Sequence, residues 1–388
     1  MTRHKAYKFR IYPNKTQSAS IGKTIGCVRF VWNQFVNEFN SNIKHRSIKE
    51  LRNSFEFLKG VSFGALQQKQ RDFLSTTKQY FNKSRKKKIG RPQFKTKKKC
   101  RLSYRLAKIQ FHLLENKIQL ERIGKVKIKY DRVIPDDVKL LSCTVSKNNI
   151  NEYYVSICVE EDIDHKPKTN KSVGIDFGIK QFVTTSDGVQ VKMLDFSETQ
   201  RKIKHLQRHM ARKEKDSSRF KKVKNKIDKL HLKIARKREH FQHQVSNYLI
   251  NNYDQIVIED LNVSGMMKNH KLAGAIQKQA WNQFVNQLNY KSKWYGKEVV
   301  KIGRFFPSSK TCNSCGSIKD ELKLSDRNFA CECGYSVDRD LNAAFNIKDV
   351  GINASQRSSM GYKTSCESGS SNSLLAIPNE MTTILNLH

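Results

Sequence analysis

Three acidic residues stand at the ends of apolar segments, where the chain can fix a carboxylate in place. Asp176 ends an apolar run in GIDFGIK, and Glu259 ends the β-branched run of QIVIEDLNV. Asp340, in SVDRDLNAAFNI, falls in the first turn of an expected helix. Carboxylate oxygens suit Mg²⁺ or Mn²⁺, and two such cations can clamp the attacking and leaving oxygens of a phosphodiester. Convergence of the three carboxylates would therefore favour metal-dependent phosphodiester hydrolysis.

Each acidic motif also has a purely structural interpretation. Asp176 would cap a turn at the end of its strand. Asp260 or Asn262 would cap the segment that follows the β-branched run, and Asp338 would cap the helix that comes after it. Strand alternation turns Glu259 and Asp260 to opposite faces, which favours Glu259 as the functional residue of the two.

Four cysteines have the spacing of a metal site: Cys312, Cys315, Cys331 and Cys333. A glycine follows the second and the fourth of them, and glycine permits the tight turns that bring thiolates onto one tetrahedral ion. Four cysteine ligands leave no open coordination position, so the expected Zn²⁺ is structural. The single residue between the last two cysteines shortens the second turn, and four unliganded thiols are the less favoured alternative.

The elements that position these residues follow an α/β pattern in the second half of the chain. Short apolar runs predict strands at 173–176, 181–185 and 256–259. A long basic helical stretch is expected from about residue 198 to 250, and an amphipathic helix at 275–295 with Gly296 as its C-cap.

The first half of the chain predicts a different unit. Residues 5–12 alternate as a strand, and apolar residues at helical spacing follow between 21 and 39. The dense basic run at 83–101 contains Gly90 and Pro92 and is expected to be a loop. Period-two patterning over 103–160 predicts an antiparallel β unit, and 161–172 resembles a linker.

Charge restricts the class of partner. The 388 residues carry 74 Lys and Arg against 35 Asp and Glu, a formal charge of +39. Such an excess favours a polyanion, and nucleic acid is the first candidate. No apolar run reaches the length of a bilayer span and the N-terminus lacks the apolar segment of a secretory signal, so a cytoplasmic protein without membrane partners is expected. The cysteine usage fits that reducing compartment better than a disulfide framework.

Seven stretches between residues 5 and 348 carry a family resemblance: YKFRIYPNKTQ, GCVRFVWN, GRPQFK, GIDFGIK, IVIEDLNVSGMMKNHKLAGAI, FFPSSKTCNSCG and DRDLNAAFNI. With them the sequence resembles the TnpB (OrfB-type) family, transposon-encoded RNA-guided DNA endonucleases related to type V CRISPR effectors.

The resemblance implies an α/β multidomain fold. Its parts would be a wedge-like β-barrel interrupted by a helical recognition lobe, and a RuvC-like (RNase H-type) nuclease domain with an inserted zinc ribbon. The implied boundaries are 1–30 and 100–165 for the barrel, 31–99 for the lobe with its basic loop, 171–310 and 334–350 for the nuclease domain, 311–333 for the ribbon and 351–388 for a disordered tail.

The resemblance also implies the activity, a metal-dependent endodeoxyribonuclease. Its acidic triad maps onto Asp176, Glu259 and Asp340, which would bind Mg²⁺ or Mn²⁺. A guide RNA from the transposon end would pair with a double-stranded DNA target, while protein groups read a short motif beside it. Delegating sequence readout to base pairing accounts for a surface rich in Lys and Arg.

We expect nucleic-acid contacts on the basic loop and on the basic helical stretch, although a solvated charged face is the alternative for any single residue. The candidates are Lys86, Lys87, Lys88, Arg91, Lys95, Lys202, Arg212, Lys222 and Arg236. Trp32 and Phe35 are expected in a core and not at a base. Two other functions stay open at this point: a nucleic-acid-binding regulator that does not cleave, guided or unguided, and a transposase or resolvase that joins DNA without RNA.

Overall fold

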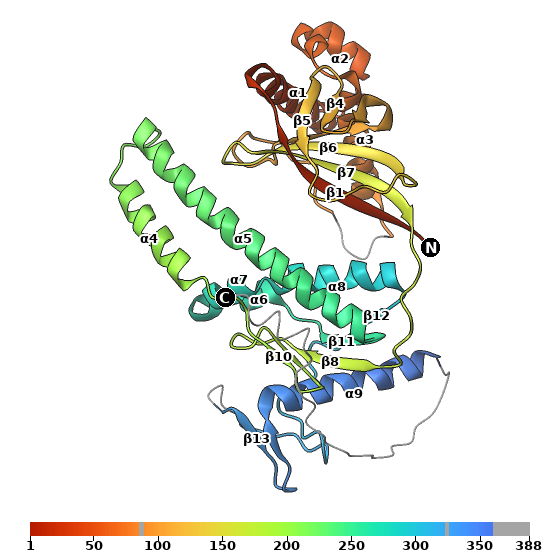
Figure 1. Cartoon of the computed structure of the whole chain (residues 1–388), viewed down its shortest axis with the longest axis vertical. Helices are drawn as coiled ribbons and strands as arrows, with labels where there is room; N and C mark the ends of the chain where they lie inside the picture. The colour runs from red at the N-terminus through yellow and green to blue at the C-terminus, as the bar shows by residue number, and fades with distance from the viewer. Residues whose placement is uncertain (85–88, 323–325, 360–388) are drawn as a thin grey trace. The chain divides into compact units, whose positions relative to one another are not determined.

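The computed structural model describes residues 1–84, 89–322 and 326–359, and the side chains of its last helix only as far as residue 353. The chain divides into two compact units (Figure 1). One comprises Thr2–Asp162, and the other comprises Met1 with the chain from Ile163 onward. We call them the N-terminal and the C-terminal unit. The division falls inside the segment 161–172 that the sequence predicts as a linker.

The N-terminal unit is built on an antiparallel sheet of seven strands in the order β2-β6-β7-β1-β5-β4-β3. The strands are β1 (Thr2–Tyr12), β2 (Ser103–Ala107), β3 (Phe111–Leu113), β4 (Lys117–Leu120), β5 (Gly124–Lys129), β6 (Lys139–Lys147) and β7 (Tyr153–Asp162). The two edge strands, β2 and β3, are consecutive in the chain and are joined only by the 3₁₀ turn η2 (Lys108–Gln110). The sheet is therefore nearly closed, as a barrel-like unit requires.

Three α-helices follow β1 in this unit: α1 (Lys15–Asn40), α2 (Ile48–Ser54) and α3 (Phe63–Phe81), with a 3₁₀ turn η1 (Glu56–Gly60) between the last two. Helix α1 begins earlier than the apolar spacing predicted. A capping box starts it, because the Asn14 side chain accepts from the Gln17 N–H and the Gln17 side chain accepts from the Asn14 N–H. The domain boundary expected at residue 30 falls inside α1.

The aromatic residues of α1 belong to the core of this unit, as expected. Trp32 and Phe35 are buried and pack against Phe73 of α3. The Trp32 indole N–H donates to the backbone oxygen of Gln93 at 3.0 Å. The polar atom of Trp32 is thereby satisfied within the protein, and the ring is not a free surface for a base.

The C-terminal unit contains a five-stranded sheet in the order β10-β9-β8-β11-β12. Its strands are β8 (Ser172–Asp176), β9 (Val183–Thr185), β10 (Gln190–Val191), β11 (Gln255–Glu259) and β12 (Glu298–Ile302). Strands β8, β11 and β12 are parallel, whereas β9 and β10 are added antiparallel beyond β8. The three strands predicted here are confirmed.

The helices of this unit are α4 (Ser197–Ala211), α5 (Ser218–Asn252), α6 (Val263–Met266), α7 (His270–Gln279), α8 (Trp281–Tyr295) and α9 (Arg339–Ser359). The basic helical stretch expected from about 198 to 250 consists of two helices, which are separated where Asp216 adopts a positive φ of 66° and Ser217 caps α5. The amphipathic helix expected from 275 is likewise divided at Ala280, where φ is 51°. Gly296 ends α8 as predicted, with φ 68°.

Helices cover both faces of the five-stranded sheet (Figure 1). Ile256 and Ile258 of β11 pack with residues of α5 and α8, whereas Val257 faces the other way, toward α9. Gly174 of β8 lies on the α9 face. A Cβ atom there would be 2.1 Å from the backbone oxygen of Ala344, so the missing side chain allows α9 to lie directly on the strand.

Helix α9 also corrects the expected start of the tail. The sequence predicts disorder from residue 351, yet α9 continues to Ser359. The predicted tail at 360–388 lies outside the described residues. Within the described part of the chain, no helix combines the length and apolar character needed to cross a bilayer.

Candidate functional site

The carboxyl ends of β8 and β11 bring the first two acids together. Ile175 of β8 is in register with Ile258 of β11, so Asp176 and Glu259 are the next residues of two adjacent parallel strands. Both alternate onto the face that α9 covers, because Gly174 and Val257 point to that side. Ligand sites in open α/β sheets gather at this edge, where neighbouring connections leave in opposite directions.

Asp340 approaches the same point from α9. It lies in the first turn of that helix, and its carboxylate is close enough to Asp176 to raise the pKa of that residue. Burial is the largest cause, and the negative charges of Glu259 and Asp340 add to it, so that the pKa of Asp176 rises to about 8. Arg339 acts in the opposite direction. Two acids from two other elements, Glu259 and Asp340, thus both act on Asp176.

Glu259 is mostly buried and has a hydrogen-bond partner that the sequence analysis did not single out. The hydroxyl of Ser308, in the loop after β12, donates to Glu259 Oε1. Burial raises the pKa of Glu259, and the hydrogen bond from Ser308 partly opposes that effect. No periodicity marks Ser308 in the sequence, because only the tertiary approach of its loop brings it to β11.

Asp338 and Asp340 have separate surroundings. The Asp338 carboxylate accepts from the backbone N–H groups of Asp340 and Leu341, at 3.0 and 3.1 Å, and therefore caps α9. Asp340 contacts Arg339 at 3.2 Å and lies 3.9 Å from Arg327, two cations that the sequence analysis also missed. The capping interpretation thus applies to Asp338, whereas Asp340 lies close enough to Asp176 to affect its pKa.

Asp260 points away from these acids, as strand alternation predicts. It forms ion pairs with Arg304 at 2.6 Å and with Lys301 at 3.4 Å. The hydrogen bond from Arg304 is the main cause that lowers the pKa of Asp260. Asn262 caps α6 through the Gly265 N–H at 3.1 Å. Of the two expected caps, Asn262 therefore has the capping role, and Asp260 is held by ion pairs instead.

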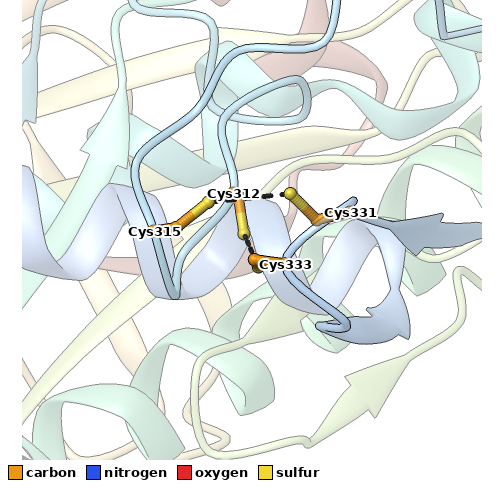
Figure 2. A group of neighbouring side chains, drawn as sticks. All are labelled: Cys312, Cys315, Cys331 and Cys333. Atoms are coloured by element: carbon orange, nitrogen blue, oxygen red, sulfur yellow. Dashed lines mark hydrogen bonds between the residues drawn. The ribbon is translucent and has the colours of Figure 1, made fainter.

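The four cysteines converge as their spacing predicts (Figure 2). The sulfur atoms of Cys312, Cys315, Cys331 and Cys333 all lie within 4.8 Å of one another. They come from two turns, and the second of these links the strands β13 (Asn328–Ala330) and β14 (Ser336–Asp338). A cluster of four thiols with this spacing is suited to a structural metal such as zinc.

Glycine makes both turns of this cluster possible. Gly316 and Gly334 have φ angles of 76° and 87°, in the left-handed region. The Gly316 N–H donates to the Cys312 oxygen at 3.0 Å, and the Gly334 N–H donates to the Cys331 oxygen at 3.0 Å. The second turn is one residue shorter and still closes, so the single-residue gap before Cys333 does not keep its sulfur from the cluster.

The expected nucleic-acid contacts fall into three groups. Lys86, Lys87 and Lys88 lie outside the described residues. Exposed positions are taken by Arg91 in the N-terminal unit and by Lys202, Arg212, Lys222 and Arg236 on α4, α5 and the turn between them. Lys202 is engaged with Glu198 at 2.6 Å. Their role in binding stays a prediction.

Lys95 differs from the other candidates because it is partly built into its own unit. Its ammonium lies 3.3 Å from the centroid of the Trp32 ring. Its backbone N–H donates to Asn33 Oδ1 at 2.8 Å. Burial, with a smaller effect from Lys69, lowers the pKa of Lys95 to about 8. Lys95 therefore takes part in the packing of its own unit, and its role in nucleic-acid binding stays a prediction.

Comparison with known proteins identifies the family. A protein of Streptomyces pristinaespiralis named "Putative RNA-guided DNA endonuclease" is 34% identical over 370 residues, which cover 90% of each chain. The "TnpB-like protein L79" of Acanthamoeba polyphaga mimivirus is 31% identical over 201 residues, covering 48% of this chain and 38% of that protein. This chain belongs to the TnpB family.

Three family models match successive parts of this TnpB-family chain. They are described as "Probable transposase" over residues 156–270, "Cas12f1-like, TNB domain" over 281–347 and "Helix-turn-helix domain" over 1–47. Within the last range the structure has β1 and a single long helix, α1. A solved Cas12f1-sgRNA-target DNA complex is 16% identical to this chain, with a TM-score of 0.37, and covers 89% of it and 99% of that chain.

Proposed function

We propose that this protein is a transposon-encoded RNA-guided DNA endonuclease. Its family membership supports the activity, since the relative that matches over 90% of each chain is named "Putative RNA-guided DNA endonuclease". The observation that carries the chemistry is the approach of Glu259, from β11, and Asp340, from α9, to Asp176 at the end of β8. A protein that only binds nucleic acid has no need for three acids held together within a strongly basic chain.

The three acids form a donor set that fits hard divalent cations. Burial raises the pKa of Asp176, and the negative charges of Glu259 and Asp340 add to that rise. A bound divalent cation would relieve this repulsion. Asp176, Glu259 and Asp340 would hold Mg²⁺ or Mn²⁺, and two such ions would stabilise the attacking and leaving oxygens of the scissile phosphodiester. The sheet with α9 on its acidic face would then be the RuvC-like nuclease domain.

The guide RNA and the basic parts of the protein would select and hold the DNA substrate. Pairing between a guide RNA from the transposon end and double-stranded DNA would select the target, and Lys and Arg would hold the nucleic-acid backbones. The exposed cations of α4 and α5 are the surface we propose for such backbone contacts. The four-cysteine ribbon would hold Zn²⁺ and stabilise the end of the unit that carries Asp340.

A plasmid library with randomised bases beside a fixed target tests the proposal. The protein is co-expressed with the RNA of its transposon end and assayed with and without Mg²⁺, alongside Asp176→Ala. We expect guide-dependent and Mg²⁺-dependent cutting that Asp176→Ala abolishes, while guide and target binding persist. Target binding by the wild type without any cutting would move the function to a guided regulator. Unguided cutting or joining of DNA would favour a transposase or resolvase.

A further inference from the structure

Ser308 lies on the loop that connects the carboxylate site with the cysteine cluster. It is four residues before Cys312 in the sequence, and the residue is 6% exposed. Its hydroxyl donates to Oε1 of Glu259. A carboxylate has about four lone-pair directions, so this single hydrogen bond leaves acceptor positions for a cation while it restricts rotation of the carboxylate.

Asn346 of α9 fixes the backbone on which Ser308 sits. Its side-chain amide donates to the backbone oxygens of Ser308 at 2.8 Å and of Thr311 at 2.7 Å. Its carbonyl accepts from the Asn313 side chain at 3.1 Å. Both donors and the acceptor of this buried amide are therefore used to hold one short loop.

A second asparagine repeats the arrangement one turn earlier. Asn342 is fully buried, donates to the Thr311 oxygen at 2.7 Å and accepts from the Asn313 N–H at 3.2 Å. Asn342 and Asn346 are four residues apart and share a face of α9. The same helix begins next to Asp340, so the position of Ser308 is set by the element that carries the third acid.

We propose that Ser308 is a positioning residue of the carboxylate site, holding Glu259 in the orientation that receives a divalent cation. The inference rests on the proposed nuclease function. A residue that only completed the packing of the loop would not need its hydroxyl on a carboxylate oxygen. Partners of this kind, which orient a metal-binding group, change metal affinity by about 10- to 100-fold when removed.

Cation binding tests this role without requiring turnover. Mn²⁺ binding to the guide-loaded protein is measured by electron paramagnetic resonance at fixed pH, and the Asp176→Ala complex gives the background from ions on the RNA. We expect Ser308→Ala to weaken the site-specific Mn²⁺ affinity by about tenfold or more. Cleavage by Ser308→Ala should recover as the metal concentration rises, while target-DNA affinity stays at the wild-type value.

The neighbouring Ser309 is the matched control. It is half-buried on the same loop, and the described residues include no hydrogen-bond partner for its hydroxyl. Ser309→Ala should bind Mn²⁺ as the wild type does, and Ser308→Thr, which keeps the hydroxyl, should stay within about threefold of it. Zinc content and thermal midpoint of each variant report whether the loop has folded.

The outcomes separate this inference from the function on which it rests. Wild-type protein that binds no more Mn²⁺ than Asp176→Ala would overturn the carboxylate site itself. If the wild type does bind the ion and Ser308→Ala binds it equally well, only the positioning role fails. A loss in Ser308→Thr as large as that in Ser308→Ala would also overturn it, because the hydroxyl would then not be the group that matters.

Discussion

Asp338 and Asp340, two residues apart at the start of α9, have different contacts. Asp338 accepts two backbone N–H groups and Asp340 faces Asp176 and its arginine neighbours. The sequence motif DRD contains both acids and left open which of them caps. Hydrogen bonding and charge distinguish them, because Asp338 accepts the N–H groups that begin the helix, whereas Asp340 is the one of the two that acts on the pKa of Asp176.

Substitution of each aspartate should therefore affect a different property. Asp338→Ala should lower the free energy of unfolding by about 1 kcal/mol, the usual effect of losing an N-cap, and retain guided cleavage. Asp340→Ala should abolish cleavage without lowering stability, since it removes a negative charge beside Asp176. Thermal unfolding and plasmid cleavage measured side by side check the pair. Loss of cleavage in Asp338→Ala at unchanged metal concentration would contradict the division.

At the residue scale, the sequence identifies acids better than their partners. Asp176 and Glu259 end apolar runs, which is a local signal. Ser308 and Arg327 reach the site from the loop after β12 and from the segment before β13, and their positions depend on how those segments pack. No local pattern reports such a contact. The spacing of Asn342 and Asn346 on a helix was the one available sign that a polar face of α9 binds another segment.

At the scale of the elements, an ion pair ties the linker to the sheet of the C-terminal unit. Lys297, which follows α8, donates to Asp254 Oδ1 at 2.5 Å and to the Pro167 oxygen at 2.7 Å. Asp254 also accepts from the backbone N–H of Asn170 at 2.7 Å. Burial raises the pKa of Asp254, but these hydrogen bonds outweigh it and lower the pKa to about 2.

This ion pair predicts a pH-dependent stability. A lowered carboxyl pKa stabilises the folded state fully above about pH 4, and the contribution is lost as the pH falls through about 2. Lys297→Met should lower the free energy of unfolding by about 2 kcal/mol at pH 7, and by less at pH 3. Hydrogen exchange of the β8 and β11 amides measures this change in stability. The exposed pair Lys301–Asp260 gives the control, since Lys301→Met should change stability by less than about 1 kcal/mol; an equal effect of both would refute the prediction.

Element types were predictable from the sequence where their period was strong, and their ends were not. The strands β8 and β11 coincide with their apolar runs. The break between α4 and α5 escaped prediction because no glycine or proline marks it; Asp216 takes the positive φ instead. The start of α1 was missed because Asn14 and Gln17 form the capping box outside the apolar pattern that defined the helix.

For the whole molecule, the charge of +39 determines how binding responds to salt. Each Lys or Arg that neutralises a phosphate releases a counterion, so affinity falls steeply with ionic strength. Guide-RNA affinity should drop by about a thousandfold or more between about 50 and 200 mM salt. Dissociation constants measured over that range give the slope of log affinity against log salt. A slope near zero would mean that base contacts and not phosphates hold the RNA.

If Asp340 belongs to the nuclease site as proposed, the close approach of α9 to β8 gives a route by which a member of this family would stop cutting DNA with all three acids intact. Any side chain at Gly174 would collide with the backbone of Ala344 and Lys348, so α9 would have to move outward and take Asp340 with it. A displacement of about 1 Å in a catalytic group can cost about a hundredfold in rate. Such a chain would still hold its guide and occupy its target. A nuclease could then evolve into a guided DNA-binding protein through a substitution at this glycine, and a comparison of the three acids alone would not detect the change.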